Sequence, residues 1–103
     1  MIPSKTIEEL ITRHNNLEKD LSSSEIDKKL FAEKSKEYSD VNEVIDFAKE
    51  YNSFDQEKKE LEKILNDNLA DEELKKMAEL ELVELKARHE LNEKKLKLFL
   101  LPK

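Results

Sequence analysis

Residues 72–100 read EELKKMAELELVELKARHELNEKKLKLFL, and this stretch decides the fold. Its leucines recur at helical steps, Asp71 is well placed to cap the first turn, and Pro102 ends the segment because proline cannot extend a helix. Glu72 and Glu73 favour the positive end of the helix dipole. At about 1.5 Å per residue, such a helix is about 40 Å long.

The segment before it predicts a helix of nearly the same length over residues 41–66, with Asn66, Asp67 and Asn68 as helix-stopping residues. Two long helices joined by a short connection pack best as an antiparallel hairpin with coiled-coil-like contacts. The apolar pattern of the 41–66 helix thins between residues 56 and 59. The whole chain, residues 1–103, is therefore expected to be a single all-α domain, a small bundle of three to four helices dominated by this hairpin.

Two shorter helices are expected at the amino-terminal end, over residues 4–21 and 25–38, covering part of one face of the hairpin. Ser4 and Ser24 are the expected caps. In the first helix, one face carries Ile7, Leu10, Ile11, His14, Leu17 and Leu21. In the second, the apolar members are Ile26, Leu30, Phe31 and Tyr38, with Lys34 where a further apolar residue would be welcome. Asp40 and Glu43 resemble a capping box for the third helix, although helices two and three could also be continuous.

Composition supports helices and excludes several classes of function. There is no glycine, which disfavours hairpin turns, phosphate-binding loops and dinucleotide-binding turns. There is no cysteine, which suits a cytoplasmic setting, and no apolar run long enough to cross a membrane. With a net charge of −6, the chain lacks a general attraction for nucleic acid, and no DNA contact is expected.

The chain offers little chemistry for catalysis. His14 lies on the apolar face of its helix and is expected to be packed, whereas His89 lies in a charged segment and is expected to be exposed. Neither has a second ligand at helical spacing, so we expect no metal site, no cofactor and no enzyme activity. Basic residues gather in residues 28–36 and again in residues 94–103. These lysines are expected to be solvated on helix surfaces, and the alternative is that they dock against an acidic or RNA surface.

Several short motifs resemble the amino-terminal domain of bacterial peptide chain release factor 1. Order and spacing agree across essentially the whole chain. The matching stretches are MIPSK at 1–5, IEELI at 7–11, RH at 13–14, SKEY at 35–38, EL at 73–74 with MA at 77–78, and LLPK at 100–103. The connection after Leu21 is shorter than usual in that family and lacks its Asp-Pro, and Lys34 replaces an apolar residue. These departures concern the second helix.

The resemblance implies a role in translation termination at UAA and UAG stop codons. It implies docking of this domain at the ribosomal large-subunit stalk base and contact with the class II release-factor GTPase. The codon-reading and Gly-Gly-Gln elements of the family are absent from these residues, so no catalytic residue is carried over. Lys28, Lys29 and Lys36 are the candidate ribosome contacts. The alternative is a free-standing helical-hairpin adaptor or oligomerisation module, and self-association of the isolated domain stays open.

Overall fold

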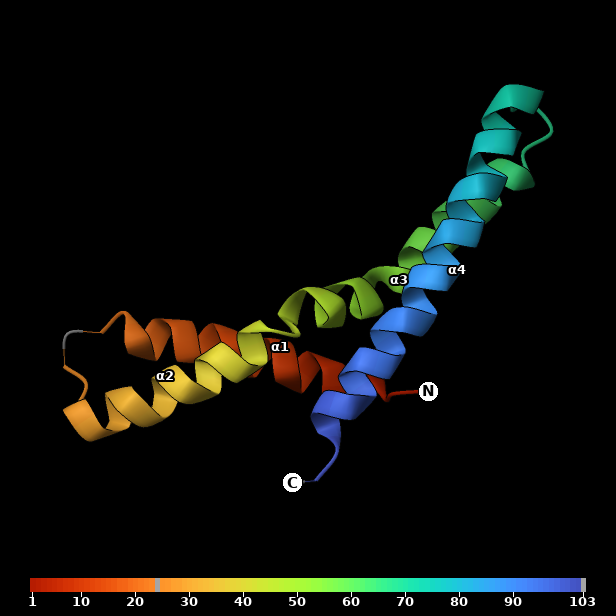
Figure 1. The fold of residues 1–103 in the computed structure, drawn as a ribbon. Coiled ribbons are helices and arrows are strands. Elements are labelled where there is room, and N and C mark those ends of the chain that lie inside the picture. The colour runs from red at the N-terminus through yellow and green to blue at the C-terminus, as the bar shows by residue number, and fades with distance from the viewer. Residues whose placement is uncertain (24, 103) are drawn as a thin grey trace.

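The computed structural model describes residues 1–23 and 25–102, which form four α-helices and, within those two ranges, no strand (Figure 1). The helices are α1, Ser4–Leu21; α2, Lys28–Asn42; α3, Ile45–Leu65; and α4, Glu72–Leu100. The expected all-α fold is confirmed. No described residue has a positive φ, so the connections between helices are made without the backbone conformation that favours glycine.

The helices form two antiparallel hairpins that diverge from a shared junction. Helices α1 and α2 form the first hairpin. Helices α3 and α4 form the second, which is the expected long hairpin and points away from the first (Figure 1). The first hairpin meets the second mainly through α1 against α3, near the amino-terminal end of each. The molecule is therefore elongated, with extents of 60 × 29 × 19 Å.

The boundary between α2 and α3 differs from the expectation. The second helix begins at Lys28 and continues through Asp40 to Asn42, so Asp40 does not cap the third helix. The two helices are separate elements, broken at Glu43 and Val44, where Val44 has φ −114° and ψ −1°. Buried Val41 lies in α2 and buried Val44 lies at the break, so apolar contacts hold the chain on both sides of the bend.

Of the three expected caps that the structure describes, Ser4, Asp40 and Asp71, only Asp71 is a cap. Asp71 caps α4 as expected, because its Oδ1 accepts from the backbone N–H of Leu74 at 2.7 Å. Ser4 is the first residue of α1 and not its cap. The carbonyl of Pro3 instead accepts from the N–H groups of Thr6 and Ile7. The expected cap Ser24 lies outside the described residues.

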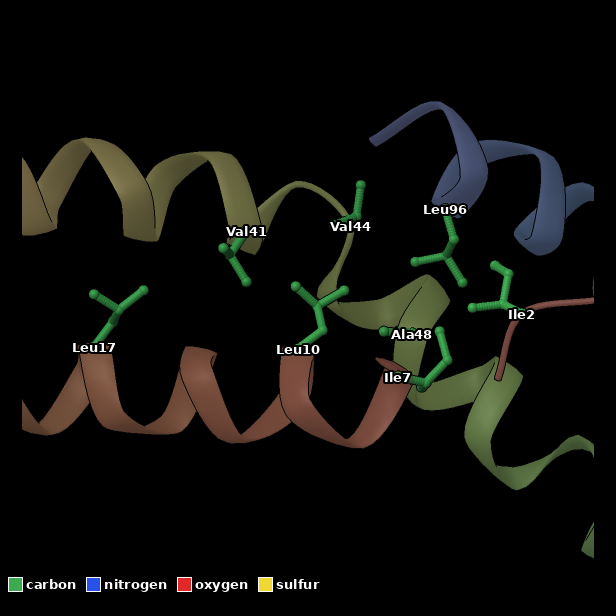
Figure 2. Close-up of a cluster of buried hydrophobic side chains, with 8 residues drawn as sticks. All are labelled: Ile2, Ile7, Leu10, Leu17, Val41, Val44, Ala48 and Leu96. Carbon is green, nitrogen blue, oxygen red and sulfur yellow. The ribbon is translucent and has the colours of Figure 1, made fainter. Parts of the chain in front are cut away.

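One buried apolar cluster joins all four helices at the junction (Figure 2). Helix α1 contributes the expected face, with Ile7 and Leu17 almost fully buried, and α4 contributes Leu96. Ala48 of α3 is 0% exposed. The buried residues of this cluster are Ile2, Ile7, Leu10, Leu17, Val41, Val44, Ala48 and Leu96.

The segment that precedes α1 ties the junction together. The backbone N–H of Ile2 donates to the Tyr51 hydroxyl at 3.0 Å, and the Met1 ammonium lies 2.8 Å from Oε1 of Glu93. Lys97 also contacts Glu93, at 3.0 Å. Hydrogen bonds from the ammonium and then from Lys97 lower the pKa of Glu93 to about 2. The start of the chain is thereby linked to α3 and α4.

The α3–α4 hairpin is loosely packed where the sequence pattern thins. A hollow of about 540 Å³ opens between the two helices, lined on the α3 side by Glu57, Glu60, Leu61 and Ile64. The α4 side contributes two glutamates, Leu85 and Arg88. Residues 56–59, where the sequence has few apolar residues, lie at the start of this loosely packed part of the hairpin.

We expect Leu96→Ala to destabilise the protein by about 2–5 kcal/mol, because it leaves a cavity in the shared cluster. The matched control is Leu98→Ala on the same helix, where the side chain is 70% exposed and the change should stay within about 0.5 kcal/mol. Urea denaturation of both variants in dilute solution measures the difference. Equal stabilities would contradict the placement of Leu96 in the core.

Candidate interaction surface on the first helical hairpin

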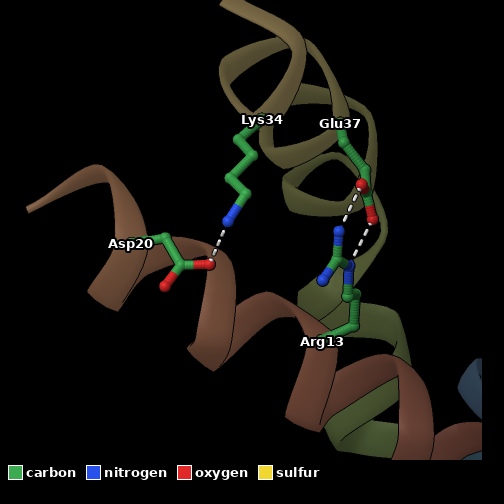
Figure 3. Close-up of polar contacts among 4 residues, drawn as sticks. All are labelled: Arg13, Asp20, Lys34 and Glu37. Atoms are coloured by element: carbon green, nitrogen blue, oxygen red, sulfur yellow. Dashed lines mark hydrogen bonds and ion pairs between the residues drawn. The ribbon is translucent and has the colours of Figure 1, made fainter. Parts of the chain in front are cut away.

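Helix α2 is held on α1 mostly by polar contacts, since Val41 is its one buried residue. The strongest contact is the bidentate pair in which Nε and Nη2 of Arg13 donate to the Glu37 carboxylate at 2.5 and 2.6 Å (Figure 3). Hydrogen bonding to Arg13 lowers the pKa of Glu37 and raises that of Arg13. Planar fork-to-carboxylate geometry of this kind fixes the register of one helix against another.

Lys34, which the apolar pattern left unexplained, has a partner in this interface. Its Nζ lies 2.6 Å from Oδ2 of Asp20 near the end of α1 (Figure 3). The lysine therefore takes the place of an apolar contact between the helices. It is not part of a free basic surface.

His14 is buried between the helices, as expected from its place on the apolar face. Its Nε2 lies 3.0 Å from Oδ1 of Asn42, and its ring stacks on Tyr38 with the centroids 5.0 Å apart. The Tyr38 hydroxyl donates to Glu18 at 2.9 Å, and this hydrogen bond raises the pKa of Tyr38. His14 thus acts as a packing residue that joins α1 to the end of α2.

The expectation for His89 is wrong. It is half-buried against α3, where its ring stacks on Phe54 at 3.7 Å and on Tyr51 at 4.6 Å between centroids. The sequence did not predict this burial, because the residues next to His89 are charged and its aromatic partners, Tyr51 and Phe54, lie far away in the sequence. Within the described ranges, no three His, Cys, Asp or Glu side chains are grouped to hold a metal ion.

The three candidate contact residues Lys28, Lys29 and Lys36 lie together on one face of α2. At 3.6 residues per turn they fall within about 100° of one another, on the side away from the residues that contact α1. All three side chains are exposed, and none forms an ion pair with another described residue. We call these three lysines the α2 basic strip.

Two apolar residues lie close in the sequence to the strip. Leu30 and Phe31, which the sequence gives as apolar members of the second helix, are each 46% exposed at the start of α2. The hairpin tip is short of apolar neighbours, so these side chains are only half covered. The surface around the α2 basic strip therefore combines lysines with partly exposed apolar groups. The spacing of apolar residues along a helix does not show this, because it is the same for a buried face and for a partly exposed one.

The second basic cluster, near the carboxyl end, is partly engaged within the molecule. Lys97 pairs with Glu93 at 3.0 Å, and Nζ of Lys95 lies 4.3 Å from the centre of the Phe47 ring. Lys103 lies outside the described residues. In the α2 basic strip all three cations are thus exposed and unpaired, whereas in the described part of the second cluster only Lys94 has neither an ion pair nor a ring contact. Among the described helices, none is long and apolar enough to cross a membrane.

Comparison with known proteins identifies the class to which this helical architecture belongs. The family model for the PCRF domain matches residues 10–103, so the chain belongs to the PCRF domain family. The PCRF domain is a non-catalytic domain of release factors. No solved structure matches the chain.

Individual relatives narrow the relationship to peptide chain release factor 1. The protein of that name from Pelagibacter ubique (strain HTCC1062) is 68% identical over 103 residues, which cover 100% of this chain and 29% of that protein. The one from Alkaliphilus oremlandii (strain OhILAs) is 36% identical over 93 residues, 88% of this chain and 26% of that protein. The resemblance indicated by the sequence motifs is thereby confirmed. The chain spans less than a third of the length of these relatives.

We expect Glu37→Gln to lower the melting temperature at neutral pH, because it removes the charge that Arg13 binds. The pair is partly exposed, so the loss should be about 1 kcal/mol or less. The folded pKa of Glu37 lies below its ordinary value of 4.5. Its contribution is therefore present above that value and is lost as the pH falls through the lower folded pKa.

Thermal melts of parent and variant from neutral to acidic pH measure this effect. The two melting temperatures should converge as the pH falls below 4.5. Glu33→Gln is the matched control, since Glu33 is exposed on the same helix and has no ion-pair partner among the described residues. A constant difference at all pH values would argue against the Arg13–Glu37 pair.

Proposed function

We propose that this chain serves translation termination as the helical domain of a class I release factor that acts at UAA and UAG codons. In this role it docks at the stalk base of the large ribosomal subunit and contacts the class II release-factor GTPase. It has no catalysis of its own, and it works in the cytoplasm. The observation that carries the proposal is the 68% identity, over the whole chain, to a protein named peptide chain release factor 1.

The shape of the molecule supports a positioning role. Two hairpins diverge from one packed junction, and the molecule extends over 60 Å. Such a frame holds surfaces apart at a fixed separation, because each hairpin is anchored in the same apolar cluster. The structure therefore resembles a rigid spacer with exposed contact surfaces more than an enzyme with an active-site pocket.

Charge distribution supports the α2 basic strip as the part that meets the ribosome. The chain as a whole has a net charge of −6, so a polyanion would be repelled from most of its surface. Lys28, Lys29 and Lys36 provide a local exception, on a helix whose other lysine, Lys34, is already paired. Phosphate contacts made by such lysines release counterions and weaken as salt rises.

The alternative function is a free-standing helical-hairpin adaptor or oligomerisation module. The exposed leucines of α4, four of which are more than 40% exposed, favour a surface for another protein. A ribosome-binding measurement separates the two functions, since an adaptor unrelated to translation has no reason to bind ribosomes through the α2 basic strip.

We expect the triple variant Lys28→Glu, Lys29→Glu, Lys36→Glu to bind purified ribosomes about tenfold or more weakly at low salt. Its dependence of log affinity on log salt should be shallower by about 2–3. Fluorescence titration of the labelled chain with large ribosomal subunits gives both quantities. The control is Lys59→Glu, Lys63→Glu, Lys76→Glu, which reverses three exposed lysines on the other hairpin. Unchanged affinity of the first variant at low salt would refute the role of the strip.

A release assay tests the absence of catalysis. Programmed ribosomes that carry peptidyl-tRNA at a UAA codon should release no peptide when this chain is added, while an intact release factor 1 does release it. Codon-dependent release by the chain alone would refute this part of the proposal.

A further inference from the structure

The hollow between α3 and α4 has two walls with the same residue pattern. One wall runs along α3 from Glu57 to Ile64, and the other runs along α4 from Glu81 to Arg88. Each wall places two glutamates, a leucine and a fourth residue at successive steps of three, one and three, so its four side chains share one face of the helix. Because the helices are antiparallel (Figure 1), the two walls run in opposite directions. We call this hollow the interhelical groove.

The interhelical groove combines an apolar floor with an acidic rim. Leu61 and Ile64 are half-buried and Leu85 is buried, whereas the four glutamates are exposed. Arg88 is the one cation among the described residues that line the groove. The volume of about 540 Å³ falls in the range of pockets that bind ligands, about 300–1,000 Å³. The groove glutamates are Glu57, Glu60, Glu81 and Glu84.

The charges of the groove glutamates are not neutralised within the molecule. None of the four, nor Arg88, forms an ion pair with another described residue. Glu57 accepts from the Ser53 hydroxyl at 3.3 Å, and Glu60 accepts from the Gln56 amide at 3.2 Å. Both donors are uncharged and belong to α3 itself. The rim therefore keeps a negative charge that a cationic partner can meet.

The lysines of the same part of the hairpin lie away from the groove. At 3.6 residues per turn, each is about 110° or more round its helix from the centre of the groove wall. The α3–α4 hairpin is thus acidic on the groove side and basic on the other sides. These lysines are Lys58, Lys59 and Lys63 on α3, and Lys75, Lys76 and Lys86 on α4.

The tip of the hairpin extends the acidic surface. Residues 65–74 carry four acidic residues and no basic one. A polyanion such as RNA is repelled by a surface of this sign, whereas a basic protein segment is attracted to it. Each wall spans seven residue steps, which is about 10 Å or two turns of helix. Charge, floor and length together favour a short basic helix as the occupant.

We propose that the interhelical groove binds a basic amphipathic helix of another protein. Apolar side chains of that helix cover the floor formed by Leu61, Ile64 and Leu85, as in other complexes in which a helix lies in a groove. Its lysine or arginine side chains lay their aliphatic stems along the floor and bring their cationic heads to the groove glutamates. The groove lies on the second hairpin and the α2 basic strip on the first, so the proposal does not rest on the proposed function.

Titration with synthetic peptides tests the proposal. The probe is a helical peptide of about 14 residues, or about four turns, whose leucines are spaced by three and four and are flanked by lysines. In NMR spectra of the isotope-labelled chain, the amide signals of residues 57–64 and 81–88 should shift, with a Kd of about 0.1 mM or lower. A peptide with glutamates in place of the lysines should bind about tenfold or more weakly. A peptide with the same residues in scrambled order should also bind more weakly, because it lacks the apolar spacing.

Removal of the rim charge provides the second test. The triple variant Glu60→Gln, Glu81→Gln, Glu84→Gln should bind the basic peptide about tenfold or more weakly than the parent. The matched control is Glu62→Gln, Glu72→Gln, Glu79→Gln, which removes the same charge from exposed positions about 150° or more round the same helices. The control should bind the peptide nearly as tightly as the parent. Circular dichroism checks that both variants stay helical.

Three outcomes would overturn the proposal. The first is a basic peptide that shows no binding up to about 1 mM. The second is an equal loss of affinity in the two triple variants, which indicates a general attraction to acidic surface and no role for the groove. The third is a single-stranded RNA oligonucleotide that shifts the same amide signals more strongly than the basic peptide does. The titrations contain no ribosome, so their result is independent of ribosome binding through the α2 basic strip.

Discussion

The arrangement depends on one apolar contact, the junction where α1, α3 and α4 meet. Ile7, Ala48 and Leu96 are each 0–1% exposed there. Ala48 has a side chain small enough to let helices approach closely, and both hairpins diverge from this point (Figure 2). In a chain that is 43% charged, apolar residues are too few to cover four helices along their length. The available burial is therefore concentrated at the crossing.

Away from the junction, the two hairpins are held by different forces. In the first hairpin, α2 buries only Val41 and relies on the pairs Arg13–Glu37 and Lys34–Asp20. Such exposed pairs contribute little individually and are screened by salt. In the second hairpin, α4 contacts α3 through Ala78, Leu85 and Leu96, but leaves an entire apolar face uncovered. Each hairpin therefore exposes a surface of its own, one basic and one apolar.

These two surfaces suit the family to which the chain belongs. In the positioning role proposed above, a PCRF domain requires contact surfaces on a stiff frame and requires no pocket with converging catalytic groups. The α2 basic strip offers a surface for electrostatic contact, and the exposed apolar residues of α4 offer one for apolar contact. Because they lie on different hairpins, a change in one surface leaves the other intact, which makes their roles separable.

The sequence by itself determined that this chain is helical, where the long helix begins, and which family it resembles. Those properties are local: Asp71 caps its own helix, and the motifs are short runs of residues. Tertiary structure decided that Lys34 pairs with Asp20, that His89 stacks on Phe54, and that Leu30 and Phe31 are half exposed. It also divided the leucines of α4 between a buried face and an exposed one. Periodicity shows that a helix has an apolar face, but which neighbour covers that face depends on residues distant in the chain.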